Sequence, residues 1–201
     1  MDNRLHAQAE CLIPMIDDIM KESEKSFQGL KAIICTSGPG SFTGLRTGLA
    51  AAKAIALSAN LPLYGISSFD AYALQFRDKG DKNKPLCVLV ESRRAEFFCQ
   101  LYDMKGTKTG EPLLILAKDL ENHLAAVFKD KKPVLIGNGI PRLLEEINPA
   151  LEYVQDHVHL DIKSLPKVFR DNAEQFIRDP VPLYLRGADI SQPKHKPRQI
   201  G

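Results

Sequence analysis

The chain has 201 residues, enough for one domain or two small lobes. Its formal net charge of +2 is too small to indicate nucleic-acid binding by itself. None of the four cysteines stands in a C-x-x-C pair, the start of the chain has no signal-peptide core, and no apolar run approaches the ~20 residues of a membrane span. We therefore expect a cytoplasmic protein without disulfides or membrane segments.

The first predicted element is a helix over residues 5–25. Four apolar residues follow the three- and four-residue spacing of one helical face: Leu12, Met15, Ile16 and Ile19. Pro14 interrupts the pattern and is expected to bend the helix. Because Ile13 and Met20 add a second apolar row, the face is wide enough to pack on two neighbours.

The next elements alternate between strand and helix. A short apolar strand is predicted at 31–36, a helix at 43–60 capped by Ser41 or Thr43, a strand at 63–66 and a helix that begins at Ser67 and Ser68. This order is typical of an α/β layered fold.

A polar, turn-rich stretch at 78–85 is the best candidate for a boundary between lobes. Beyond it the pattern predicts a hairpin, two further strands and three helices. These are strands at 86–90, 95–102, 113–117 and 134–136, and helices at 119–128, 142–147 and 166–178.

Residues 38–46 read GPGSFTGLR, a glycine-rich turn before a helix. The turn lacks the Lys-Ser or Lys-Thr pair of a phosphate-binding P-loop, and its third glycine is one position late for a dinucleotide fingerprint. It also lacks the G-x-S-x-G hydrolase elbow. Because backbone N–H groups at a helix start suit an anion, Gly38, Gly40 and Ser41 are kept as a candidate anion-facing loop.

Small residues recur every four positions in the following helix, at Gly44, Gly48 and Ala52. Such a ridge allows close approach of another backbone, either within this chain or from a partner; spacing alone leaves both open. Leu45 and Leu49 flank the ridge. Arg46, one turn from the loop, is either a surface charge or a contact to a partner or loop carbonyl.

Metal and nucleophilic chemistry are not indicated. No two of the five histidines have the i, i+4 spacing of a helical metal site, and His157 and His159 fit solvated loop residues better. Serines near helix starts are explained by capping. Glu91 and Glu96 flank an arginine pair, which is more typical of an exposed hairpin than of a catalytic site.

Five stretches, in this order, resemble the bacterial TsaB (YeaZ) family over nearly the whole chain: LIPMIDDIM, GPGSFTGLRTGLAAAKAIAL, PLYGISSFDAYA, ESRRAEFF and PLYLRGADI. The resemblance implies an actin- and Hsp70-like (ASKHA, ribonuclease H-like) two-lobe α/β fold. We expect a first lobe at 1–84, a second at 85–181 and a basic tail at 182–201.

The resemblance also implies a non-catalytic subunit. It would pair with a TsaD-like catalytic subunit that adds threonylcarbamoyl to N6 of the adenosine beside the tRNA anticodon, with a TsaE-like ATPase joining the complex and tRNA bound indirectly. No peptidase activity, metal or cofactor is expected in the isolated chain, although a nucleotide at the complex interface is compatible with the family. The partner interface would comprise Leu12, Met15, Ile16, Ile19, Gly44, Leu45, Arg46, Gly48, Leu49 and Ala52, and homodimers can form without the partner.

The chain departs from the family pattern at its start, where an opening strand and hairpin are expected before the first helix. We interpret this as N-terminal truncation or a misassigned start. The alternative function, an ATP-dependent small-molecule kinase of the same fold, would need that hairpin. The basic tail is interpreted as a solvated end in preference to a tRNA contact.

Overall fold

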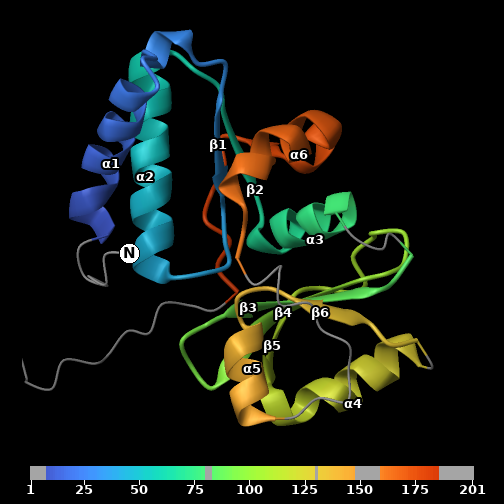
Figure 1. The fold of residues 1–201 in the computed structure, drawn as a ribbon. Coiled ribbons are helices and arrows are strands. Elements are labelled where there is room, and N and C mark those ends of the chain that lie inside the picture. The colour runs from blue at the N-terminus through green and yellow to red at the C-terminus, as the bar shows by residue number, and fades with distance from the viewer. Residues whose placement is uncertain (1–7, 80–82, 130, 148–158, 186–201) are drawn as a thin grey trace, which may run out of the picture.

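The protein folds into two lobes, each built around a β-sheet (Figure 1). The computed structural model describes residues 8–79, 83–129, 131–147 and 159–185. The first sheet has the order β1 (Ile33–Thr36), β2 (Leu63–Ile66), β7 (Ile177–Arg178), with a parallel and then an antiparallel pairing. The second has the order β5 (Leu113–Leu116), β4 (Glu96–Tyr102), β3 (Leu86–Glu91), β6 (Val134–Ile136).

Within the described residues six helices cover these sheets, and all six were predicted from the sequence. They are α1 (Gln8–Glu22), α2 (Phe42–Ala59), α3 (Ser68–Lys79), α4 (Ala117–Phe128), α5 (Ile140–Glu146) and α6 (Leu165–Asp171). Short 3-10 turns lie at Phe27–Gly29, Ile162–Ser164 and Ala173–Gln175. Pro14 lies inside α1, which continues past it.

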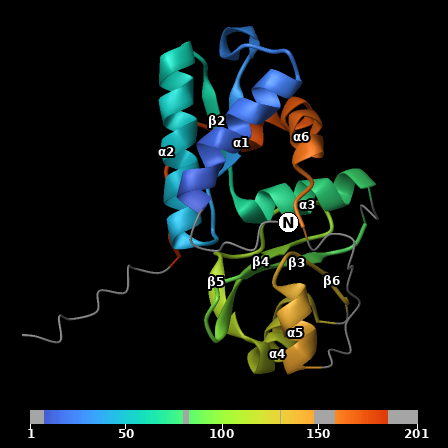
Figure 2. The same cartoon turned by 60° about the vertical axis from the view of Figure 1, so that its left-hand side comes forward.

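The first lobe has three layers. Figures 1 and 2 show α1 and α2 on one side of β1 and β2, with α6 and α3 on the other. Because successive strand residues face opposite sides, Ile33 and Cys35 of β1 pack with the alanines of α2, whereas Ile34 packs toward α6. In the described part of the chain β1 pairs only with β2, and all four of its residues are half-buried.

The sheet of the second lobe is covered on both faces. Helices α4 and α5 pack on one face, through Leu120 and Leu143 among others. Helix α3 packs on the other face through Phe69 and Phe76, so it joins the two lobes. The antiparallel β3–β4 pairing confirms the predicted hairpin, and the parallel β3–β6 pairing brings the segment after α4 back beside it.

The last predicted helix, 166–178, is wrong in length. Helix α6 ends at Asp171, because Asn172 adopts a non-helical φ of −144° and its side chain donates a hydrogen bond to the Val168 carbonyl. The chain then turns back so that Phe176 meets Phe169 edge to face, with ring centroids 4.9 Å apart. Sequence periodicity did not reveal this return, because the apolar residues after Asn172 fit a helix equally well.

The sequence placed residues 85–181 in the second lobe, yet β7 within that range completes the first sheet. The chain therefore crosses between lobes more than once, which a division into consecutive ranges cannot express. The exact boundaries stay a prediction. His157 and the basic tail beyond residue 185 lie outside the described residues.

Candidate functional site

The turn before α2 is fixed by its backbone. Gly38 has a φ of +103° in a cis Gly38–Pro39 unit, and a Cβ there would lie 2.9 Å from Leu45 and 3.1 Å from the Leu183 carbonyl. Its carbonyl accepts a hydrogen bond of 2.6 Å from the Ser68 N–H. Turn geometry and packing therefore explain this glycine without any ligand.

Ser41 caps α2, as one of the two expected capping residues. Its hydroxyl accepts a hydrogen bond from the Gly44 N–H at 3.3 Å. At the other end Asn60 closes the helix in the left-handed conformation. Gly40 differs from Gly38, since no heavy atom of a described residue other than its chain neighbours lies within 4 Å of the position where its Cβ would be. The turn thus contains one glycine that the fold requires and one that borders open space.

An apolar groove of about 580 Å³ runs between α1, α2 and β1. Leu12, Ile16 and Met20 form the α1 wall, at the four-residue spacing of one helical face. Gly44, Leu45 and Gly48 are among the α2 residues that line it, and Leu160, Ile162 and Leu165 close it from the other side of β1.

The apolar sector of α1 is wider than the part that α2 covers. Ile13, Met15 and Ile19 are 51%, 59% and 59% exposed. On a helical wheel Met15 and Ile19 lie to one side of the groove-facing stripe, and Ile13 lies to the other. Large apolar side chains that remain exposed in adjacent positions mark an interaction surface.

Gly48 is half-buried, yet among the described residues outside its own helix none has a heavy atom within 4 Å of the position where its Cβ would be. Since glycine costs about 1 kcal/mol relative to alanine inside a helix, close packing within this chain does not account for it. Of the two interpretations that spacing left open, close packing within the chain finds no contact among the described residues at Gly48, and a partner contact stays a prediction.

Two residues of the predicted interface face inward. Leu49 is 4% exposed and Ala52 is 8% exposed, the latter packed with Leu63 and β1. Their side chains belong to the chain's own core, so the surface available to a partner consists of the remaining predicted residues. Periodicity could not separate the two sides of α2, because small and apolar residues occur on both.

Arg46 is held by two rings. Its guanidinium lies 3.9 Å from the Phe42 ring centroid, and its Nε donates a hydrogen bond of 2.9 Å to the Tyr184 hydroxyl. The two rings are themselves in contact, with centroids 5.3 Å apart. A contact to a loop carbonyl, one of the alternatives to a surface charge, is not among the contacts described for this side chain.

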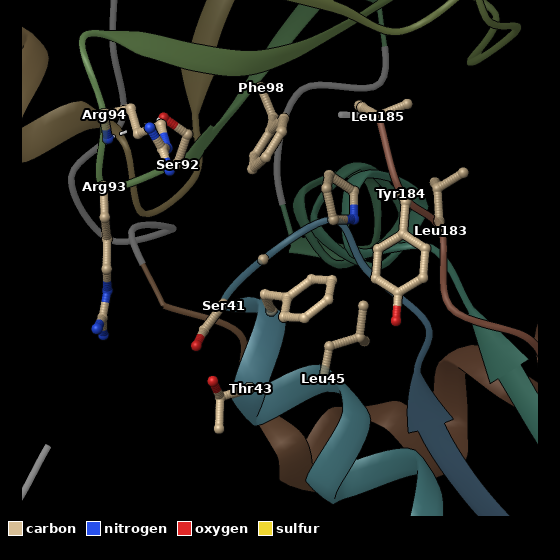
Figure 3. Close-up of a pocket in the computed structure, with 13 residues that line it drawn as sticks. Ser41, Thr43, Leu45, Ser92, Arg93, Arg94, Phe98, Leu183, Tyr184 and Leu185 are labelled. Carbon is tan, nitrogen blue, oxygen red and sulfur yellow. Dashed lines mark hydrogen bonds between the residues drawn. The ribbon is translucent and has the colours of Figure 1, made fainter. Parts of the chain in front are cut away.

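A second hollow, of about 540 Å³, lies between the lobes (Figure 3). The loop at 39–43 forms one wall and Ser92–Arg94, at the tip of the β3–β4 hairpin, forms another. Phe98 and residues 183–185 complete it. The structure therefore brings the predicted anion-facing residues Gly40 and Ser41 together with an arginine pair that sequence reasoning had treated as surface charge.

The hairpin tip is anchored to α5. Glu91 accepts hydrogen bonds from the Arg93 N–H at 2.5 Å and from Arg142 Nε at 2.7 Å. Its own N–H donates to Asn138 at 2.9 Å. Glu91 is thus engaged in positioning the turn, and no described contact gives it a catalytic arrangement.

Among the described residues no three of His, Cys, Asp or Glu gather closely enough to hold a metal ion. No helix in the same residues is long and apolar enough to cross a membrane.

The sequence model of the family described as TsaD, tRNA N6-adenosine threonylcarbamoyltransferase, matches residues 3–133. A protein of that name from Erythrobacter litoralis is 31% identical over 169 residues, which are 84% of this chain and 46% of the relative. The tRNA threonylcarbamoyladenosine biosynthesis protein TsaB of Buchnera aphidicola (subsp. Baizongia pistaciae) is 29% identical over 150 residues, 69% of this chain and 66% of the relative. TsaB of Escherichia coli is 34% identical over 110 residues, 54% of this chain and 46% of the relative. The chain thus spans from about half to two thirds of these relatives.

The solved structure of YeaZ from Pseudomonas aeruginosa has a TM-score of 0.68 and covers 89% of this chain and 86% of its own, at 16% identity. At that identity the likeness shows a shared fold, and it confirms the expected two-lobe actin/Hsp70-like architecture. The match over residues 3–133 shows that this chain belongs to the family described as TsaD, and its similarity to several TsaB proteins confirms the resemblance to TsaB (YeaZ) within that group.

Proposed function

We propose that the protein is a non-catalytic subunit in the biosynthesis of threonylcarbamoyladenosine in tRNA. In this role it binds a TsaD-like catalytic subunit in the cytoplasm and contacts a TsaE-like ATPase and tRNA only through the complex. The names of its relatives support the pathway. The observation that carries the proposal is the apolar surface of α1 and α2 that no other part of the described chain covers.

This surface, which we call the α1–α2 face, consists of Met15, Ile19, Gly48 and their groove-lining neighbours Leu12, Ile16, Gly44 and Leu45. Its apolar side chains and the open space over Gly48 are suited to an apolar helix pair of a partner. Helices approach one another most closely where a small residue faces the contact. The same face offers a homodimer contact when the partner is absent.

No catalytic constellation competes with this assignment in the described residues. Glu91 is bound to Arg142, and Ser41 is engaged in capping α2. We therefore propose no enzymatic activity for the isolated chain, peptidase activity included. The kinase-like alternative gains no support from the relatives, whose names describe tRNA modification.

The test is co-expression with the cognate TsaD-like subunit, followed by pull-down and measurement of the dissociation constant. Gly48→Arg places a long charged side chain in the contact and should weaken binding at least 100-fold, about 2.7 kcal/mol. Ala50→Arg is the matched control, since Ala50 is exposed on α2 about 200° around the helix from Gly48.

A second pair of variants tests the part of the surface that α1 contributes. Ile19→Glu should weaken the complex at least tenfold because it buries a charge at an apolar contact. Ile177→Glu changes a similarly exposed isoleucine, at 66%, on β7 and should leave binding unchanged. If Gly48→Arg and Ala50→Arg bound the partner equally well, the α1–α2 face would not be the interface.

A further inference from the structure

A third hollow lies at the end of the second sheet where β3 begins and β4 ends. It has a volume of about 540 Å³, and its walls come from the start of β3, the turn between β4 and β5, and the end of α4 with the loop after it. We call it the basic hollow; it is lined by Pro85, Asp103–Lys105, Thr109, Val127–Lys129 and Lys131.

The basic hollow is separate from the surfaces described above. It shares no lining residue with the groove beside α1 and α2 or with the interlobe hollow. Helix α4 belongs to the other lobe from α1 and α2 (Figure 1). A partner bound in the basic hollow therefore leaves the lining residues of the α1–α2 groove free.

The rim of the basic hollow is positively charged. Lys105, Lys129 and Lys131 are exposed, and within the described part of the chain none of them forms an ion pair. Lys131 Nζ instead donates to the Met104 sulfur at 3.2 Å, and a thioether is a weak acceptor. Three ammonium groups thus surround the hollow without a carboxylate to offset them.

The one acidic lining residue, Asp103, is engaged in its own turn. One oxygen of its carboxylate accepts hydrogen bonds from the N–H groups of Lys105 and Thr107, both at 2.8 Å. The guanidinium of Arg77 donates to the Asp103 and Met104 carbonyls at 2.7 and 3.1 Å, which brings a further positive charge to the same turn. The field at the hollow is therefore positive despite the aspartate.

The floor of the hollow is apolar. Val127 and Phe128 are half-buried and pack against the core of the second sheet, so only part of each side chain remains for the hollow. Met104 is 40% exposed and Pro85 closes the floor from β3. An apolar centre inside a charged rim is the usual composition of a protein interface.

We propose that the basic hollow docks an acidic segment of a partner protein. An apolar side chain of that segment contacts Met104 and Phe128, and its carboxylates face the three lysines. The lysines disfavour a metal cation. An RNA backbone would use the lysines but leave the apolar floor uncovered, whereas an acidic peptide with an apolar residue complements both.

The proposal does not depend on the TsaD-like partner, so it is tested on the full chain alone. The probe is a fluorescent octapeptide with a central Leu-Phe pair between two groups of three acidic residues. A peptide of equal charge with Ser-Ser at the centre and a single-stranded pentaribonucleotide are the comparisons. Anisotropy at low salt should show the Leu-Phe peptide binding at least tenfold more tightly than either.

Variants separate the hollow from general electrostatics. Lys131→Glu should weaken binding of the Leu-Phe peptide at least tenfold, whereas Lys118→Glu, the same change on exposed α4 outside the hollow, should alter it less than twofold. Met104→Ser should weaken the Leu-Phe peptide at least threefold and leave the Ser-Ser peptide unchanged. Lys129→Gly should weaken binding while keeping or raising the melting temperature, because Lys129 has a φ of +54° that glycine adopts without strain.

Chemical shifts of the Lys105 and Val127 amides in the unmodified chain give a readout that no variant affects. Failure of the Leu-Phe peptide to shift them at millimolar concentration would overturn the proposal. So would a ratio below tenfold between the two peptides, which would indicate charge attraction alone, or equal effects of Lys131→Glu and Lys118→Glu. Tighter binding of the pentaribonucleotide than of the Leu-Phe peptide would also overturn it and would assign the lysines to nucleic acid.

Discussion

The two sheets differ in how completely this chain covers them. In the second lobe β3 is sealed from both sides, with Leu86–Val90 at most 2% exposed. In the first lobe every residue of β1 is half-buried, and the groove beside it remains open. Both strands are short, apolar and rich in branched residues, so the difference lies in their surroundings.

This contrast indicates that the two lobes have different roles, one in stability and the other in association. The second sheet completes its hydrophobic core within this chain, with α4 and α5 on one face and α3 on the other, and can supply stability. The first lobe leaves apolar area exposed, which costs free energy in the isolated chain and becomes favourable when a partner covers it. Stability should therefore respond to substitutions in the second lobe, and association to those on the α1–α2 face.

The largest expected effect is at Gly137, where β6 ends against β3. Its φ is +112°, and a Cβ would lie 2.1 Å from the Leu89 carbonyl oxygen. Gly137→Ala should lower the free energy of unfolding by about 4 kcal/mol or more, measured by urea denaturation. Gly48→Ala in the first lobe is the matched control, and it should raise the free energy of unfolding by up to ~1 kcal/mol. Equal losses of unfolding free energy in the two glycine variants would contradict the proposed difference between the lobes.

The next effect concerns a core leucine. Leu120 of α4 is fully buried, whereas Leu57 of α2 is 86% exposed. Leu120→Ala should cost about 2–5 kcal/mol of unfolding free energy through lost burial and an internal cavity. Leu57→Ala should change the same quantity by less than about 0.5 kcal/mol. A loss at Leu57 comparable to that at Leu120 would mean that α2 is covered in the isolated chain.

A smaller effect is expected at the joint between the lobes. Tyr102 of β4 donates a hydrogen bond of 2.8 Å to Asp70 of α3, and Lys108 also binds this carboxylate at 2.8 Å. Tyr102→Phe should cost about 1–2 kcal/mol in unfolding free energy, because a buried acceptor loses one of its donors.

The same variant should change how the free energy of unfolding depends on pH above about 10. Burial, together with Asp70, raises the pKa of Tyr102 far above its usual value near 10. At a pH above about 10 but below the raised pKa, the tyrosine loses its proton in the unfolded chain and keeps it in the folded chain. The free energy of unfolding therefore falls as pH rises above about 10. Tyr102→Phe should therefore flatten that fall. Some slope should remain, since burial also raises the pKa of Tyr72 to about 12. Unchanged steepness in the variant would show that Tyr102 is not the group responsible.

Strands were the most predictable elements from sequence, because short apolar runs bounded by turns leave few alternatives. Residues 63–66 and 134–136 are strands with the predicted bounds. The end of α6 was not predictable, since it depends on the non-helical backbone of Asn172 and on the contact of Phe176 with Phe169 after the turn. The inward orientation of Leu49 was also missed, because helical spacing does not say which side the sheet occupies.

The sequence by itself determined the order of elements, the turn at GPGSFTGLR and the family. These depend on local periodicity, on backbone preferences and on a specific run of residues, all of which can be read along the chain. Only the tertiary structure decided that Gly38 is required by its turn whereas Gly48 faces open space, and that Arg93 stands across a hollow from Gly40. Residues far apart in sequence come together through packing between the lobes, and no local sequence pattern predicts such contacts.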